Sequence, residues 1–201
     1  FFVSVANSLA VEMLDTWKNR SEPVMVLVGP PSSGKSHLAS VWSTEMNAKT
    51  IQSAELPDIK MTNLLDLDNL VVEDIEKIEK LSRAARRAAE ENLLHTFNAT
   101  CSKNRRLLVT GQIFPASWNF LIPDLSSRLG SVPIARMRSP DDSLLVALMM
   151  KMFEDRQMKV SPETIKYSIS RIDRSFAFVQ MFVKELDLIS LQLKKAVTIP
   201  L

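Results

Sequence analysis

The sequence predicts an α/β fold, in which helices flank a parallel β-sheet and a small α-helical lid domain follows. Three observations predict it. A short apolar run, a glycine-containing loop and a helix-forming segment follow one another directly over residues 23–46. Further apolar runs then alternate with helix-forming segments, and after residue 138 only helix-forming segments remain. We therefore expect an α/β domain over residues 1–138 and a helical domain over residues 139–201.

The composition is that of an ordinary globular protein, because 46% of the residues are hydrophobic and 24% are charged. The formal net charge of +2 is too small to indicate nucleic-acid binding. The single cysteine, Cys101, cannot form an internal disulfide, and we expect it to be semi-buried. No apolar run approaches the roughly 20 residues of a membrane span, so we expect no membrane partner and a cytoplasmic location.

The first elements of the sheet domain are expected from apolar patterning. Apolar side chains at near-helical spacing predict a helix over residues 4–19. PVMVLVG (23–29) is a continuous apolar run that ends in glycine, as buried parallel strands do. KSHLASVWSTEM (35–46) follows as a helix and AKTIQSAEL (48–56) as a second strand.

The next segments extend the same alternation. NLVVEDI (69–75) is a further buried strand, and it ends in acidic residues. Residues 79–100 are rich in helix formers. Arginine and glutamate lie about a turn apart there, so we expect a solvated helix face rather than a nucleic-acid patch. RRLLVTG (105–111) and SVPIARM (131–137) are the remaining strands.

Three helices are expected in the lid domain. A serine and a proline followed by acids favour a helix start at Ser139, and the same signal recurs at Ser161. The third helix is expected over residues 173–193.

The segment GPPSSGKS matches the pattern G-x-x-x-x-G-K-[ST] of a phosphate-binding P-loop, between a strand and a helix as the motif requires. Glycine lets backbone N–H groups approach a phosphate, and the following helix directs its positive dipole end at the anion. The lysine ammonium can reach the outer phosphates, and the serine hydroxyl can bind Mg²⁺. The predicted nucleotide-binding residues are Gly29, Pro30, Pro31, Ser32, Ser33, Gly34, Lys35, Ser36 and, directly after the loop, His37.

Two carboxylates, Glu73 and Asp74, end the apolar run LVVED. Acids at the carboxyl end of a strand beside a P-loop can hold a magnesium ion and orient a water molecule. The alternative is that both acids only begin the next helix. The P-loop upstream favours the metal and water roles.

Several segments, taken in order, resemble the AAA+ module of the DnaA family of replication initiators and its relatives, most closely the Hda branch. These segments are GKSHLA, VVEDIEKI, LLHTFNA, LLVTGQIFP and IPDLSSRLG, and the series covers nearly the whole chain. IDRS and the end KKAVTIPL strengthen the likeness to that branch. The resemblance implies a P-loop AAA+ domain with a helical lid that binds ADP or ATP together with Mg²⁺.

The resemblance also assigns roles around the nucleotide. Lys35 and Ser36 are the Walker A pair, and Glu73 and Asp74 hold the Walker B positions. Ser36 and Glu73 would hold the metal, and Asp74 would orient the water. Gln112 falls at the sensor I position.

Two arginines receive roles from the same likeness. Arg128 falls at the arginine-finger position, where it would serve the nucleotide of a partner; a helix-end cation is the alternative. Arg174 falls at sensor II in the lid, and an ion pair on its Asp173 side is the alternative.

This chain departs from the family pattern at the residues that cut ATP. Glu73 is one methylene longer than the usual aspartate, Asp74 is one shorter than the common glutamate, and Gln112 is neutral where aspartate is usual. A carboxylate displaced by about 1 Å can lower a rate roughly 10²-fold. We therefore expect the chain alone to hold its nucleotide and to hydrolyse it slowly or not at all.

The resemblance implies a regulator that approaches ATP-bound DnaA and promotes hydrolysis of that ATP through Arg128, which inhibits replication initiation. The expected partners are DnaA and the polymerase sliding clamp, the latter through an N-terminal peptide that is not seen before Phe1. The sequence leaves open whether the protein forms a homo-oligomer. We expect no sequence-specific DNA binding, because no segment resembles the DNA-reading domain of DnaA, and a location near the bacterial nucleoid. Two alternatives remain: an autonomous AAA+ ATPase of initiator or loader type, and an adaptor without an activating arginine.

Overall fold

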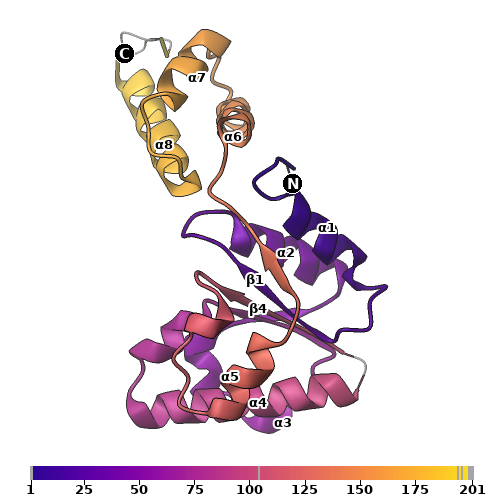
Figure 1. The fold of residues 1–201 in the computed structure, drawn as a ribbon. Helices are drawn as coiled ribbons and strands as arrows, with labels where there is room; N and C mark the ends of the chain where they lie inside the picture. Colours follow the sequence, from indigo (N-terminus) through magenta and orange to yellow (C-terminus); the bar gives the residue numbers. More distant parts are fainter. Residues whose placement is uncertain (1, 104, 194, 196, 199–201) are drawn as a thin grey trace. The chain divides into compact units, whose positions relative to one another are not determined.

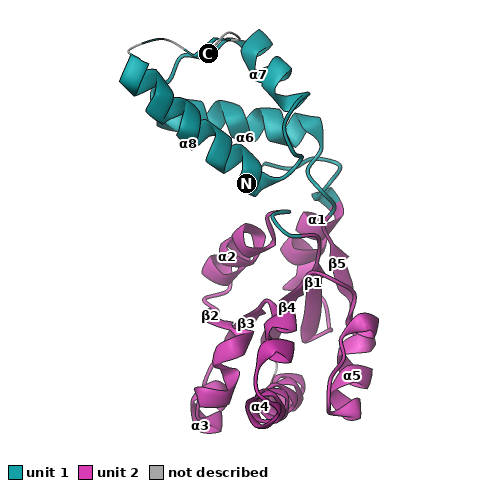
Figure 2. Ribbon diagram, turned by 90° about the vertical axis from the view of Figure 1, so that its left-hand side faces the viewer, with its two compact units in different colours: residues 1–8, 31–33, 138–201 teal, residues 9–30, 34–137 magenta. Residues whose placement is uncertain are grey.

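The computed structural model of the chain describes residues 2–103, 105–193, 195 and 197–198. The chain divides into two compact units, which Figure 2 colours separately. The α/β unit comprises residues 9–30 and 34–137, and the helical unit comprises residues 1–8, 31–33 and 138–201. Within the described part of the chain, no helix is long and apolar enough to cross a membrane.

The α/β unit is built on a five-stranded parallel sheet with the strand order β2-β3-β4-β1-β5 (Figure 1). The strands are β1 (Val24–Val28), β2 (Lys49–Gln52), β3 (Asn69–Glu73), β4 (Arg106–Gly111) and β5 (Ile134–Arg136). Because all strands are parallel, their carboxyl ends lie at one edge of the sheet. Val28 of β1 is paired with Gly111 of β4, so the loops that follow these two strands are neighbours.

Helices cover both faces of the sheet (Figure 1). The helices of this unit are α1 (Ser8–Trp17), α2 (Lys35–Glu45), α3 (Met61–Leu65), α4 (Arg83–Ser102) and α5 (Pro123–Gly130), with short 3₁₀ helices η1 (Ser53–Asp58), η2 (Ile75–Lys80) and η3 (Pro115–Ser117). Val26 packs with residues of α4 and α5, whereas its neighbour Leu27 packs with α1 and α2. The continuous apolar run of β1 therefore reflects a strand that is buried on both faces.

The helical unit has a hydrophobic core of its own. It contains α6 (Asp142–Asp155), α7 (Pro162–Ile169) and α8 (Phe176–Leu193). Buried side chains from all three helices form the core, namely Leu145, Met149, Phe153, Ile165, Ile169, Val179 and Val183. The Asp141 carboxylate caps α6 by accepting a hydrogen bond from the Leu144 N–H at 2.8 Å, and the Ser161 hydroxyl caps α7 from the Thr164 N–H at 3.2 Å.

The structure shortens several expected elements and adds others. The expected strand over 48–56 stops at Gln52, and the 3₁₀ helix η1 follows because Pro57 cannot donate to a strand ladder and Glu55 forms a capping box with Gln52. The helix expected from residue 79 begins at Arg83, where the Ser82 hydroxyl caps it. Helices α3 and α5 were not expected from the sequence.

Two burial expectations were wrong. Cys101 is exposed rather than semi-buried, because it lies on the last turn of α4. Glu90 is completely buried, so the arginine–glutamate segment of α4 is not solvated throughout.

The helix expected over residues 4–19 is also shorter than expected, because α1 covers Ser8–Trp17.

Candidate nucleotide site

The P-loop connects the end of β1 to the start of α2. Gly34 is the N-cap of α2 and has a φ of 92° and a ψ of 12°, a left-handed conformation in which a side chain is strained. Ser32 also has a positive φ, of 55°. These two residues turn the chain sharply into a helix of 11 residues. The backbone conformation therefore favours glycine at residue 34, the second glycine of the motif.

Lys35 turns its ammonium back into this loop. Its Nζ donates hydrogen bonds to the carbonyl oxygens of Gly29 at 2.7 Å and Pro30 at 2.9 Å, and the residue is only 7% exposed. Burial lowers the pKa of Lys35 below its ordinary value, while Asp74, Glu76 and Glu73 oppose that shift. The lysine of the P-loop and the acids beyond β3 therefore share one electrostatic environment.

The loop also contains a buried hydroxyl without a partner. Ser33 Oγ has no hydrogen-bond partner among the described residues, and Ser33 is only 2% exposed. A buried polar group without a partner is costly, and an anion acceptor would satisfy this one. Within the α/β unit, the Lys35 ammonium and the N-terminus of α2 likewise suit a phosphate group. Ser36 and His37 are exposed on the first turn of α2.

Glu73 and Asp74 lie at the carboxyl end of β3, as predicted. Asp74 has a φ of 54°, and its backbone is fixed on both sides. Its N–H donates to Thr110 Oγ1 at 3.1 Å, and its carbonyl accepts from Ser53 Oγ at 2.6 Å. These contacts fix the turn at Asp74, which is also the N-cap of the 3₁₀ helix η2, so the alternative that the acids begin the next helix applies to Asp74 as well.

Both carboxylates have polar partners, which we call the Gln52–Lys77 bridge. Glu73 Oε2 accepts a hydrogen bond from Gln52 Nε2 at 2.9 Å. Lys77 Nζ lies 2.7 Å from Asp74 Oδ2 and donates to Gln52 Oε1 at 3.0 Å. The bridge thus joins both carboxylates through one amide and one ammonium. Sequence analysis did not identify either residue of the bridge.

Glu76 is a third acid that sequence analysis missed. Its Oε1 accepts hydrogen bonds from the backbone N–H of Gln112, from that of Ile113 at 3.1 Å and from the Trp118 indole at 3.2 Å. A Cβ on Gly111 would lie 2.6 Å from the Trp118 ring and 2.9 Å from Glu76 Oε1, so only glycine fits there. Glu76 therefore fixes the turn after β4, in which the Gln112 side chain is exposed.

Arg128 lies on α5, away from the interior of the unit. Its side chain is 42% exposed, and its Nε donates to both carboxylate oxygens of Asp124 at 2.9 Å. The guanidinium also lies 5.9 Å from the centre of the Phe97 ring. Arg128 is in the last turn of α5, so the helix-end position that the sequence offered as an alternative is present as well.

A buried ion pair holds the start of α5. Glu90, which is 0% exposed, pairs with Arg86 at 3.0 Å, and its Oε2 accepts the Ile122 N–H at 2.9 Å. Ile122 is the N-cap of α5. The fully buried charge of Glu90 on α4 thus sets the position of the helix that carries Arg128.

Arg174 pairs with Asp142 rather than on the Asp173 side. The Arg174 Nη2 lies 3.2 Å from Asp142 Oδ1, and both side chains are well exposed, at 66% and 58%. Such an exposed pair contributes little to stability, so the guanidinium is available for other partners.

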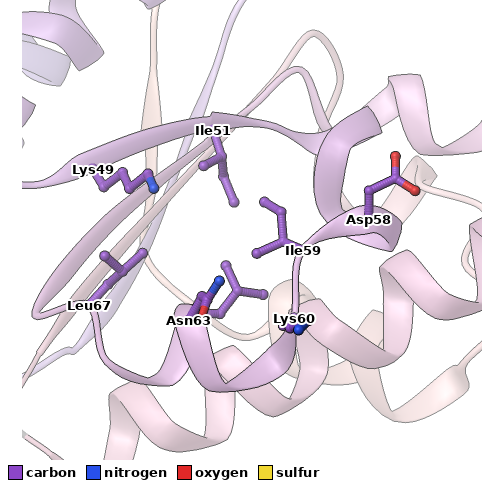
Figure 3. A pocket seen from close by; sticks show the side chains of 8 residues that line it. Lys49, Ile51, Asp58, Ile59, Lys60, Asn63 and Leu67 are labelled. Carbon is purple, nitrogen blue, oxygen red and sulfur yellow. The ribbon is translucent and has the colours of Figure 1, made fainter.

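A separate cavity of about 490 Å³ opens beside β2. Ile51 and Ile59 point towards one another in it, and Lys49 lies at its rim (Figure 3). Its lining contains none of the predicted site residues, so it is distinct from the P-loop. In the described residues no group of three or more His, Cys, Asp or Glu gathers as a metal centre.

None of the protein-family models matches the chain. An uncharacterised protein of Haemophilus influenzae is 26% identical over 196 residues, which cover 94% of this chain and 85% of that protein. The DnaA initiator of Magnetococcus marinus is 31% identical over 101 residues, or 50% of this chain and 22% of DnaA. The DnaA of Streptococcus mutans is 24% identical over 185 residues, or 83% and 40%. The matched part spans less than half the length of these two DnaA proteins.

Solved structures share the fold. Domain III of DnaA from Thermotoga maritima has a TM-score of 0.81 at 17% identity and covers 100% of this chain and 90% of its own. AMPPCP-bound DnaA from Aquifex aeolicus has a TM-score of 0.79 at 14% identity, covering 96% and 65%. The predicted fold class is confirmed by these likenesses. The chain therefore shares the fold of DnaA domain III, and DnaA proteins are among its sequence relatives.

Proposed function

We propose that this chain is a nucleotide-binding regulator of the Hda type, which promotes hydrolysis of DnaA-bound ATP and so reduces initiation of chromosomal replication. Its own nucleotide, ADP or ATP, stabilises the conformation of the protein. Its Arg128 serves the nucleotide of the partner. DnaA and the sliding clamp are the proposed partners.

Three features of the P-loop support nucleotide binding. The Ser33 hydroxyl is buried and has no hydrogen-bond partner in the described part of the chain, the Lys35 ammonium is turned into the loop, and Gly34 has the left-handed backbone that the loop needs. The AMPPCP complex of the Aquifex aeolicus DnaA shows that a protein of this fold binds an ATP analogue.

The observation that carries the regulatory role is the exposure of Arg128. A guanidinium that is to act on another protein has to be accessible, and 42% of this side chain is exposed on α5. An arginine supplied in trans stabilises the charge that develops on the transferred phosphoryl group, which raises rates by roughly 10³–10⁵. The pair with Asp124 is half-exposed and weak, so it can open when a partner's phosphate is offered.

The test measures hydrolysis of ATP bound to DnaA, with and without this protein, on DNA loaded with the sliding clamp. We expect stimulation by the wild-type chain and loss of nearly all of it in Arg128→Ala. Arg87→Ala is the matched control, because Arg87 forms a comparable exposed pair with Glu91 at 2.9 Å. Stimulation that survives Arg128→Ala would contradict the proposal.

The same assay separates the alternatives. An autonomous ATPase would hydrolyse ATP at a similar rate without DnaA. An adaptor would bind its partners in a pull-down assay with no change in DnaA-bound ATP. Binding of Arg128→Ala to DnaA, measured in parallel, distinguishes a lost chemical contribution from a lost interface.

A further inference from the structure

We propose that the Lys77 ammonium serves as a tethered counter-ion for the two Walker B carboxylates, so that this chain binds its nucleotide with little dependence on Mg²⁺. The inference rests on the proposed nucleotide binding and adds a residue and a cation requirement to it. The donor set expected for the metal, Ser36 with Glu73, is thereby replaced in part by a group of the protein.

The geometry of the Gln52–Lys77 bridge carries the inference. Lys77 Nζ lies 2.7 Å from Asp74 Oδ2, a short contact for an ammonium and a carboxylate. The Gln52 amide uses its oxygen for Lys77 and its nitrogen for Glu73, at 3.0 Å and 2.9 Å. One amide therefore connects both acids to the same ammonium, and neither carboxylate keeps all its oxygens for an ion.

The local charge balance points the same way. Glu73, Asp74 and Glu76 all act on the Lys35 ammonium. Together with Lys77, the site contains two ammonium groups and three carboxylates, and so has a net charge of about −1. Without Lys77 that charge would be about −2, which is the setting that attracts a hard divalent cation.

Asp74 lies in a fixed turn, whereas the Lys77 side chain is half-exposed. The backbone of Asp74 is fixed by hydrogen bonds with Thr110 and Ser53, which hold the turn that places its carboxylate beside Lys77. Lys77 is 47% exposed, so its side chain is free to be substituted without loss of core packing. Lys77 can therefore be substituted to remove the ammonium while the turn that carries the acids stays in place.

The experiment measures the dissociation constant of a fluorescent ADP analogue with excess Mg²⁺ and with EDTA. For the wild-type chain we expect the two values to differ by less than about threefold, because the tethered ammonium already offsets part of the negative charge of the acids. For Lys77→Met we expect binding about tenfold tighter with Mg²⁺ than with EDTA, because the acids are then available to the ion. Methionine keeps the length of the side chain and removes its charge.

Lys80→Met is the matched control, since Lys80 is an exposed lysine of the same 3₁₀ helix η2. We expect it to behave as the wild type, and thermal unfolding checks that each variant is folded. Strong Mg²⁺ dependence of binding in the wild-type chain would overturn this inference, and so would the absence of Mg²⁺ dependence in Lys77→Met. If Lys35→Ala loses binding in the same assay, the proposed nucleotide binding itself still stands. No binding by any folded variant would overturn the proposed function and this inference together.

Discussion

The P-loop and the acidic edge of the sheet lie at the same ends of the strands but are built differently. In the P-loop, the groups suited to a phosphate have few partners among the described residues: Ser33 Oγ has none, and the Lys35 ammonium donates to two carbonyl oxygens. At the acidic edge, Glu73 and Asp74 are already joined to Gln52 and Lys77, and Glu76 is committed to the turn after β4. The first region thus keeps polar groups that a ligand could use, whereas the polar groups of the second are paired within the protein.

This difference between the two regions has different consequences for nucleotide binding and for nucleotide hydrolysis. Hydrolysis needs a carboxylate that is free to hold a metal or orient a water molecule, and a displacement of about 1 Å costs roughly 10²-fold in rate. Binding needs the loop, the ammonium and the helix N-terminus. A nucleotide bound here would therefore persist, which is what a conformational role requires.

The largest expected effect concerns Glu76. We expect Glu76→Ala to lower the free energy of unfolding by about 2–4 kcal/mol, because three N–H donors lose one charged acceptor. Urea denaturation followed by tryptophan fluorescence measures it. Glu79→Ala is the control, since Glu79 accepts a single hydrogen bond, from Asn119 N–H at 3.1 Å. Equal effects of the two variants would remove the structural role that we assign to Glu76.

Lys35→Ala tests the binding side of the comparison. We expect the affinity for ADP to fall by about 10²-fold, or about 2.7 kcal/mol, because a desolvated ammonium contributes strongly to phosphate binding. Fluorescence titration gives the dissociation constant. An affinity within threefold of the wild type would show that the loop does not carry the binding.

The pH dependence of that affinity follows from the pKa of Lys35. Burial lowers this pKa below 10.5 in the free chain, and a bound phosphate would raise it again. Above the free-state pKa, binding must take up a proton, so the affinity should fall by up to about tenfold per pH unit as the pH rises. Lys35→Ala should show no such fall, and a profile shared by both proteins would argue against the ammonium.

The smallest effect is expected at the acidic edge. Glu73→Gln and Asp74→Asn should each change the affinity for ADP by less than about threefold, because the bridge already neutralises both carboxylates in part. The same titration measures it. A loss comparable to that of Lys35→Ala would erase the distinction between the two regions.

Local patterns in the sequence predicted the parts of the site that depend on neighbouring residues. GPPSSGKS identified the loop, and LVVED placed two acids at the end of β3. The strand and helix alternation predicted the parallel sheet, because buried strands form continuous apolar runs.

Contacts between distant residues could not be predicted in this way. Gln52 meets Glu73 across 21 positions, and Glu90 meets Ile122 across 32. In the sequence, Lys77 looks like one charge of a solvated helix, and Glu90 like another. Only the sheet order and the fold of η2 and α5 bring these side chains to the positions where they act. The start of α5 was missed for the same reason, since its N-cap residue Ile122 has no capping side chain and depends on Glu90.

The most direct test of the central claim follows labelled ATP bound to the isolated chain. After rapid removal of free nucleotide, the fraction converted to ADP is measured over time in the wild type, with Lys35→Ala as the binding control. Nucleotide binding without hydrolysis predicts stable retention of ATP by the wild type, with conversion far slower than in an active AAA+ ATPase, and no retention by Lys35→Ala. Rapid, repeated turnover by the isolated wild-type chain that disappears in Lys35→Ala would contradict it.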